Sequence, residues 1–180
     1  MNPVVQIIKQ NEKMMSALAL VKELGLPDCW IGAGFIRNSV WDYLHYKQSD
    51  HSVDDVDVIF FDAENTSIVY ENQLELALRQ INPSLKWSVK NQERMRVKYN
   101  LNYVSSIEAI SYWPETATCI AARLNISDQL EIISPYGIDD LMNMIVKPSP
   151  NSSPEVFYKR LTEKKWQERW PMLRVEILEK

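Results

Sequence analysis

The sequence is poor in the residues that most often hold metals or form cross-links. It has only two histidines, His45 and His51, which excludes a metal site built from several histidines. Its two cysteines, Cys29 and Cys119, each lie in an apolar stretch, which favours buried free thiols over a disulfide or a metal site. No apolar run approaches the roughly 20 residues that a helix needs to cross a bilayer. The sequence therefore predicts no membrane span.

The net charge excludes one further class of partner. It is formally −4 at pH 7, which gives no general electrostatic basis for binding duplex DNA. Hydrophobic residues make up 46% of the chain and charged residues 24%, as in an ordinary globular domain. Residues 1–3 carry no basic segment before an apolar core, so no signal peptide is predicted. We expect a cytoplasmic protein.

Hydrophobic residues recur at helical spacing in some stretches and form short extended runs in others. This pattern predicts one α/β domain, with a mixed sheet flanked by helices and a C-terminal helical tail. The predicted domain is 1–148, and 149–180 is a linker followed by a helix that packs on the same domain. Helices are expected at 2–24, 35–46, 67–81, 105–113, 138–145 and 153–170. Strands are expected at 29–31, 53–61, 85–89, 118–124 and 130–133.

Two aspartates begin the predicted strand at 53–61. Asp55 and Asp57 are two residues apart, so both point to one face of the strand, whereas Asp54 points to the other face and to solvent. At ~6.5 Å, two such charges repel by roughly 2–3 kcal/mol at an effective dielectric near 20. A bound Mg²⁺ would offset this repulsion, because Mg²⁺ prefers oxygen ligands. The alternative is a pair of solvated acids in a loop before the strand.

A turn of small residues joins the strand at 29–31 to the helix that follows it. Gly32, Ala33 and Gly34 allow a tight turn or the close approach of a ligand to the backbone. The amides of the following helix would face an anion placed there. Arg37 lies on the first turn of that helix, where its planar guanidinium suits a phosphate or a carboxylate. A simple tight turn, with Arg37 paired to an aspartate, is the alternative interpretation.

Taken together, the two motifs carry a specific resemblance. The run Gly32-Ala33-Gly34-Phe35-Ile36-Arg37-Asn38, followed some twenty residues later by Asp55-Val56-Asp57-Val58, resembles the signature of the polymerase-β-type nucleotidyltransferase superfamily. It is most similar to the head domain of CCA-adding enzymes and poly(A) polymerases. The segments at 87–95, 113–118 and 135–141 further resemble a family of small bacterial nucleotidyltransferase-like proteins. This likeness covers nearly the whole chain and implies the polymerase-β-type fold.

The resemblance implies a role for each residue of the two motifs. Gly32, Ala33 and Gly34 would contact the triphosphate, and Arg37 would shape the turn or bind phosphate. Asp55 and Asp57 would be catalytic and would hold two Mg²⁺ ions, with Mn²⁺ as the alternative metal. Two residues depart from the head-domain pattern. Ala33 replaces a glycine, which we expect to be a mild change.

The second departure is Asn38, which replaces an aspartate, and we expect it to remove a partner of Arg37. Many members of the superfamily also place a third carboxylate on a later strand, but strand 85–89 has none. Glu131 is a candidate for this third metal ligand, and a solvent-facing residue is the alternative. Lys90, Asn91 and Arg94 are expected to bind nucleotide or acceptor RNA, with a solvated polar stretch as the alternative.

Glu115 and the predicted last helix could each contact an acceptor, but a structural role is the simpler interpretation of both. Glu115 would contact an acceptor or, more simply, cap local backbone. The predicted last helix would bind acceptor nucleic acid or form a solvated face with aromatic anchors in the core. That helix carries the basic residues Lys159, Arg160, Lys164 and Lys165, with Trp166 and Trp170 nearby.

These observations predict a Mg²⁺-dependent nucleotidyltransferase. It would move a nucleoside monophosphate from an NTP to an unknown acceptor, which is an RNA end, a protein or a small molecule, with release of pyrophosphate. The chain lacks the long helical segments that position tRNA in CCA-adding enzymes, which argues against full CCA synthesis. A nucleotide- or partner-binding module that has lost catalysis is the alternative. A third interpretation is an interaction protein that captures partners through residues 151–180.

Overall fold

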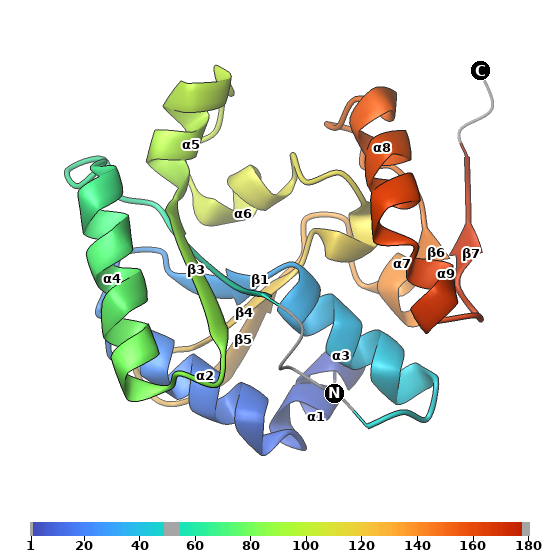
Figure 1. Ribbon diagram of the computed structural model, residues 1–180, viewed down its shortest axis with the longest axis horizontal. Coiled ribbons are helices and arrows are strands. Elements are labelled where there is room, and N and C mark those ends of the chain that lie inside the picture. Colours follow the sequence, from blue (N-terminus) through green and yellow to red (C-terminus); the bar gives the residue numbers. More distant parts are fainter. Residues whose placement is uncertain (1, 49–54, 178–180) are drawn as a thin grey trace.

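A five-stranded mixed sheet forms the centre of the molecule. The computed structural model describes residues 2–48 and 55–177 (Figure 1). The sheet has the order β3-β2-β1-β4-β5. Among its neighbouring strands, β2 and β3 run parallel and the other pairs run antiparallel, which confirms the predicted mixed sheet. The strands are β1 (Trp30–Gly32), β2 (Asp55–Phe60), β3 (Lys86–Asn91), β4 (Ala121–Leu124) and β5 (Leu130–Ile133).

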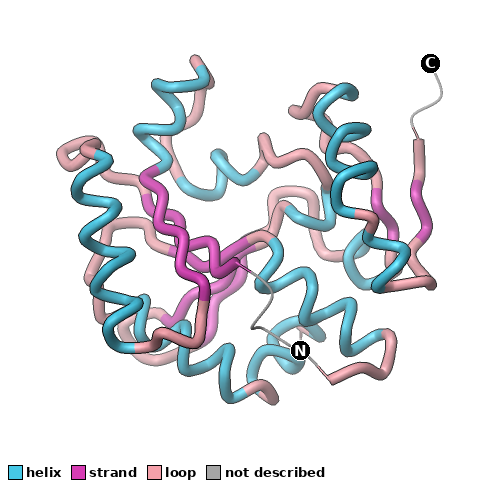
Figure 2. The backbone as a smooth tube through the Cα atoms, viewed as in Figure 1, coloured by secondary structure: helices cyan, strands magenta, loops and turns pink. Residues whose placement is uncertain are grey.

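Helices surround the sheet (Figure 2), and a small parallel sheet pairs two short strands in the C-terminal part. These two strands are β6 (Ile145–Val146) and β7 (Arg174–Val175). A single turn of 3-10 helix lies at Thr116–Thr118. The α-helices are α1 (Pro3–Lys9), α2 (Glu12–Lys22), α3 (Gly34–Leu44), α4 (Ile68–Ile81), α5 (Gln92–Tyr99), α6 (Ser106–Ile110), α7 (Asp139–Met142), α8 (Pro154–Lys164) and α9 (Trp166–Arg169).

Several element boundaries differ from the prediction. The expected first helix divides because Asn11 accepts a hydrogen bond from the amide of Met14 and caps a new helix, α2. The expected last helix divides at Lys165, which adopts φ +46°. The expected strand 118–124 begins only at Ala121, and α5, β6 and β7 were not predicted. Asp54, which was expected to point to solvent, lies outside the described residues, as does His51.

The two faces of β2 have different surroundings. Val56, Val58 and Phe60 are fully buried in the main core, which also includes apolar residues of α1, α2, α3 and α4. On the opposite face, Ile59 joins a smaller cluster with Trp30 and Ile110. Asp57 points to this second face, because side chains alternate along a strand. The acidic pair therefore lies on the more thinly covered side of the sheet.

Helix α4 closes the open edge of β3. The carboxylate of Glu75 accepts from the amide of Val89, and that of Glu71 accepts from the amide of Asn91, both over short distances of 2.8–2.9 Å. An unpaired strand edge invites pairing with other chains, and acidic side chains that satisfy its amides prevent this. Helix α4 therefore takes the place of a sixth strand.

The C-terminal helices pack on α3. Trp41 of α3 makes edge-to-face contacts with Trp166 and Trp170, with ring centroids 5.9 and 5.2 Å apart. The buried carboxylate of Asp42 accepts from the indole nitrogen of Trp170 at 2.8 Å and pairs with Arg169 at 3.1 Å. These contacts join the tail to the helix that follows the small-residue turn. Within residues 2–48 and 55–177, no helix combines the length and apolar character that a membrane span requires.

Candidate active site

The acidic pair lies where β2 meets the end of β1. Asp57 is the register partner of Gly32 on β1, so the carboxylate lies beside the small-residue turn. Asp55 is exposed, whereas Asp57 is partly buried. Among the described residues, neither aspartate takes part in a hydrogen bond or an ion pair. The structure thus brings the two predicted motifs together and leaves the carboxylate oxygens available to a ligand.

The environment of Asp57 disfavours its charged form. Burial, and then the negative charge of Asp55, raise the pKa of Asp57 to about 6, well above the usual value for an aspartate. Positive charges on Arg37, Lys164 and Arg160 act in the opposite direction and lower this pKa. The three cations therefore lie close enough to interact with the buried carboxylate. A bound divalent cation would remove the repulsion between the two aspartates.

Gly32 is required by a tryptophan that covers the turn. A Cβ atom at position 32 would lie 2.7 Å from the Trp113 ring, which is closer than real contacts, and 3.1 Å from the carbonyl oxygen of Ile120, which is tighter than most. Gly34 differs, because a Cβ there would meet its nearest neighbours at ordinary distances of 3.5 Å or more. Of the two glycines, only Gly32 is therefore fixed by packing.

Ala33 holds a backbone conformation that normally belongs to glycine. Its φ of 54° and ψ of −130° place it in a region that residues with a side chain rarely adopt. The amide of Ala33 donates to the carbonyl of Ile120 at 3.1 Å, and this bond helps to hold the strained turn. The expectation that alanine is a mild change at this position is therefore wrong with respect to backbone strain.

The strain at Ala33 leads to a stability prediction. Replacing Ala33 with glycine should raise the free energy of unfolding by about 0.5–2 kcal/mol, because relief of a strained φ outweighs the added entropy of the unfolded chain. Urea denaturation measures the change. Ala77→Gly in the interior of α4 is the control and should lower stability by about 1 kcal/mol. Equal destabilisation by both substitutions would contradict a strained Ala33.

The first turn of α3 presents backbone amides without a side-chain cap. The helix begins at Gly34, directly after Ala33, and this N-cap residue supplies no side-chain hydrogen bond to the helix. The N-terminus of a helix attracts anions through these amides and the helix dipole. Because the turn precedes it and Asp57 lies beside the turn, an anion here would also be close to the acidic pair.

Arg37 is part of the core and does not face solvent. Its guanidinium carbon lies 4.8 Å from the ring centroids of both Trp41 and Trp166, two rings that contact each other edge to face. The residue is only 4% exposed. Nε and Nη2 donate to Oδ1 of Asn38, and Nη1 donates to the hydroxyl of Thr118 at 2.7 Å. Arg37 was expected either to shape the turn or to bind phosphate, and these contacts support the first role.

The same contacts correct the interpretation of Asn38. Asparagine was expected to remove a partner of Arg37, but its side-chain oxygen accepts two hydrogen bonds from that guanidinium, at 3.1 and 2.8 Å. An amide oxygen serves as an acceptor here without adding a negative charge. Asn38 therefore keeps the geometry that we had assigned to a carboxylate.

Glu115 is a buried residue whose role differs from both roles that the sequence suggested. It is 1% exposed, its Oε2 accepts from Thr118 at 2.8 Å, and its Oε1 accepts from Arg160 of α8 at 2.7 Å. Thr118 in turn accepts from Arg37. The expectation that Glu115 caps local backbone is therefore wrong. Its side chain instead links α3 to α8 through a continuous hydrogen-bonded network.

Asn91 and Arg94 lie farther along the sheet than the acidic pair, whereas Lys90 is the register partner of Ile59, two residues from Asp57. Asn91 pairs with Phe60, three residues beyond Asp57 in the parallel register, which is about 10 Å along the strand. Its side chain is 0% exposed and bonds to backbone groups of neighbouring segments, so the expectation that it contacts a nucleotide is wrong.

The two cations of this group are paired with carboxylates of α4. Lys90 pairs with Glu75 at 2.8 Å, and Arg94 makes a bidentate pair with Glu71 at 2.6–2.8 Å. These hydrogen bonds raise the pKa of Arg94. Each cation neutralises a carboxylate that closes the edge of β3. The structure therefore gives Lys90 and Arg94 a structural role, and their contact with a nucleotide stays a prediction.

Glu131 is also distant from the acidic pair. The register leads from Asp57 through β1 and β4 to β5, three strands away and hence ~14 Å across the sheet. Hydrogen bonds from Asn125 and Arg123 lower the pKa of Glu131 and account for both of its carboxylate oxygens. The expectation that Glu131 is a third metal ligand is therefore wrong. The described residues contain no cluster of three or more metal-ligating acids, histidines or cysteines.

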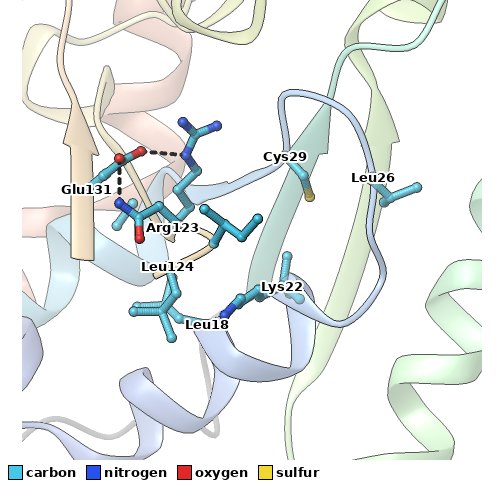
Figure 3. Close-up of a pocket in the computed structure, with 11 residues that line it drawn as sticks. Leu18, Lys22, Leu26, Cys29, Arg123, Leu124 and Glu131 are labelled. Atoms are coloured by element: carbon cyan, nitrogen blue, oxygen red, sulfur yellow. Dashed lines mark hydrogen bonds and ion pairs between the residues drawn. The ribbon is translucent and has the colours of Figure 1, made fainter. Parts of the chain in front are cut away.

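A cavity of about 430 Å³ lies at the other end of the sheet (Figure 3). It is lined by apolar residues of α2 and by Cys29, Arg123 and Glu131. Cys29 precedes β1, whereas the turn and Asp57 lie at the end of that strand. Burial and the charge of Asp28 raise the pKa of the Cys29 thiol to about 12, so it stays protonated at neutral pH. This cavity is therefore separate from the acidic pair.

Comparisons with known proteins agree with the geometry. The sequence model of a family described as "Nucleotidyltransferase" matches residues 19–175. A protein whose NMR structure is described as revealing a CCA-adding enzyme head domain is 34% identical and superimposes with a TM-score of 0.86. That match covers 97% of this chain and 94% of the other. A search of curated proteins finds no match.

Complete CCA-adding enzymes share this fold over part of their length. The complex of a CCA-adding enzyme with CTP gives a TM-score of 0.62 at 14% identity, and the match covers 97% of this chain and 43% of that enzyme. The Thermotoga maritima CCA-adding enzyme complexed with tRNA gives 0.60 at 13% identity, with 97% and 42% covered. At this identity the likeness shows the fold alone. The chain spans less than half the length of these enzymes.

Proposed function

The chain belongs to this nucleotidyltransferase family, and we propose that it transfers a nucleoside monophosphate from an NTP to an acceptor hydroxyl and releases pyrophosphate. The observation that carries the proposal is the position of Asp55 and Asp57. Two carboxylates that make no other polar contact among the described residues lie next to a helix N-terminus without a side-chain cap. This arrangement suits a triphosphate together with a divalent cation.

The residues present fit such a cation. Mg²⁺ is usually held by one or two carboxylates together with phosphate oxygens of the substrate, so a third protein acid is not essential. Asp55 and Asp57 would hold Mg²⁺, with Mn²⁺ as the alternative. The bound ion would lower the pKa of the acceptor hydroxyl and neutralise charge on the α-phosphate. The raised pKa of Asp57 supports this fit, because a neighbouring cation would stabilise the charged form that burial disfavours.

The chain's own residues would place the triphosphate. Amides at the start of α3 would bind phosphate oxygens and orient the α-phosphate towards Asp57, and Gly32 would keep Trp113 close above the turn. The acceptor oxygen forms a bond to the α-phosphorus as the bond to the bridging oxygen breaks. Pyrophosphate leaves, and the hydroxyl proton passes to solvent. Arg37 would keep the turn in shape from within the core.

The chemistry requires only that the acceptor carries a hydroxyl that can reach the α-phosphate in line with the leaving pyrophosphate. An RNA end, a protein hydroxyl and a small-molecule hydroxyl are the three classes to test. Within residues 2–48 and 55–177 no third metal-ligating side chain joins the two aspartates, which favours a second candidate function, a nucleotide-binding module without catalysis. The two functions differ in the fate of the α-phosphate, which stays with the nucleotide in a binding module.

A transfer assay with labelled NTPs tests the proposal. Each NTP, labelled at the α- or the γ-phosphate, is incubated with the protein, Mg²⁺ and an acceptor fraction of RNA, protein or small molecules. We expect α-label in one acceptor fraction and γ-label in pyrophosphate. The Asp55→Asn/Asp57→Asn variant should lose at least a thousandfold in rate, because it loses both proposed metal ligands. Glu23→Gln, which changes an exposed carboxylate on the far side of α2, is the control and should be unchanged.

A further inference from the structure

Basic residues near the end of α8 divide into two groups. Lys159 pairs with Glu163, and Lys165 pairs with Glu168, so both are engaged with acids in their own part of the chain. Arg160 and Lys164 are four residues apart and share a different face of the helix. Lys164 makes no ion pair or hydrogen bond within residues 2–48 and 55–177. One face of α8 therefore has an available cation next to a guanidinium.

The buried network of Glu115 fixes this face beside the start of α3. Arg160 is held by Glu115, which bonds to Thr118, which bonds to Arg37. The guanidinium of Arg37 in turn lies against the first residue of α3, since a Cβ atom on Gly34 would be 3.6 Å from its Nη2. Both guanidiniums also contact the ring of Trp166, at 4.8 and 5.8 Å. Arg160 is thus anchored next to the helix N-terminus that follows the turn.

The cationic face of α8 has donors left for a ligand. Arg160 and Lys164 lie one helical turn apart on the face that Glu115 joins to the start of α3. Arg160 keeps a partly exposed side chain, 29% of it accessible, and its Nη1 makes no hydrogen bond among the described residues. The guanidinium can therefore bind a ligand without leaving Glu115.

We propose that Arg160 and Lys164 of α8 bind the β- and γ-phosphates of the nucleotide, and that the C-terminal helix forms the second wall of the site. The proposal rests on the proposed function, since it identifies which part of the substrate the tail contacts. Glu115 is the positioning residue that holds Arg160. Arg37 is excluded from this role because it is 4% exposed and its guanidinium donates to Asn38 and Thr118.

The balance of charges at the site is a second reason to assign phosphate binding to Arg160 and Lys164. Without them, Asp55, Asp57 and Glu115 outweigh Arg37, and the site would repel a nucleotide. With Arg160 and Lys164, acids and bases are equal in number. An NTP with two divalent cations is itself neutral, so it would enter without a net electrostatic cost. In this arrangement α8 supplies the charge that makes the acidic pair compatible with a triphosphate.

A pair of charge-reversal variants tests the role of α8. Lys164→Glu and Lys159→Glu both lie on α8 and change the net charge equally, but they lie on different faces, and only Lys159→Glu removes an exposed ion pair, that with Glu163. Isothermal titration of the full chain with inorganic tripolyphosphate, in excess Mg²⁺ and at fixed ionic strength, reports phosphate binding without the sugar or base. We expect Lys164→Glu to weaken binding at least tenfold and Lys159→Glu to weaken it less than threefold.

Equal effects of the two substitutions, or no binding of tripolyphosphate to the parent protein, would overturn the assignment. Circular dichroism of both variants checks that α8 remains folded, and Lys164→Gln repeats the test with a smaller perturbation. The outcome is independent of catalysis. If no acceptor receives α-label while Lys164→Glu loses tripolyphosphate, the phosphate site stands and the transfer reaction fails. If transfer occurs while both lysine variants bind like the parent, the reaction stands and the role of α8 fails.

Discussion

Replacing Asp57 with asparagine is expected to stabilise the metal-free protein, although it should abolish the proposed reaction. Folding raises the pKa of this carboxyl to about 6, so above that pH the folded protein holds a charge that its surroundings disfavour. A shift of about two pKa units corresponds to ~3 kcal/mol at most. Because Asp57 is partly exposed, solvent screening reduces this, and we expect a gain of about 1–2 kcal/mol at pH 8.

The gain in the free energy of unfolding that Asp57→Asn brings should depend on pH in a definite direction. A carboxyl whose pKa is raised by folding contributes most to stability below its unfolded pKa, and this contribution is lost as the pH rises through about 6. The advantage of Asp57→Asn over the parent should therefore grow between about pH 4 and pH 7 and then level off. Urea denaturation in EDTA at a series of pH values measures it.

A control of opposite sign is available at Asp62. Hydrogen bonds from the side chain of Asn65 and from backbone amides lower the pKa of Asp62, so its charged form is favoured by folding. Asp62→Asn should therefore lower stability at neutral pH. If Asp57→Asn were less stable than the parent at pH 8, the charge on Asp57 would not destabilise the metal-free protein. A bound cation would then have no such repulsion to offset.

The second large effect is expected at Glu71, far from the proposed chemistry. Glu71→Ala should lower the free energy of unfolding by about 3–5 kcal/mol, because it removes a fully buried carboxylate from an ion pair and a strand edge. The amide of Asn91 and the guanidinium of Arg94 would both lose their acceptor. Arg94 is partly exposed, which places the expected value near the lower end of the range.

Nucleotide binding separates this structural role from the one expected from the sequence. Arg94→Met should reduce stability but leave the affinity for Mg²⁺-NTP within twofold of the parent, because Arg94 lies beyond the end of β3 away from Asp57. The double variant Glu71→Ala/Arg94→Met should be more stable than Glu71→Ala alone, since it leaves no unpaired charge. A tenfold loss of NTP affinity in Arg94→Met would restore the nucleotide-binding interpretation.

The acidic pair and the turn could be predicted because both depend on local pattern. Alternation along β2 fixes the shared face of Asp55 and Asp57, and small residues before a helix mark the turn. The resemblance then predicted that the two motifs meet, and the register between Asp57 and Gly32 agrees with it. Family and mixed-sheet fold were likewise accessible from the sequence.

What the sequence could not reveal depends on distant contacts. Whether Arg37 binds a ligand or stacks in the core is decided by Trp166, some 130 residues away. Whether Glu115 caps backbone or holds a cation is decided by Arg160 on another helix. In the same way, the polar residues after β3 have the pattern of ligand contacts, and only the acids of α4 show that their partners are internal.

The fate of the α-phosphate tests the central claim most directly. In the labelled-NTP assay, the account predicts that α-label passes to one acceptor fraction while γ-label appears in pyrophosphate, and that Asp55→Asn/Asp57→Asn abolishes both. Retention of the α-label on the nucleotide with every NTP and every acceptor fraction, or transfer that survives loss of both aspartates, would contradict it.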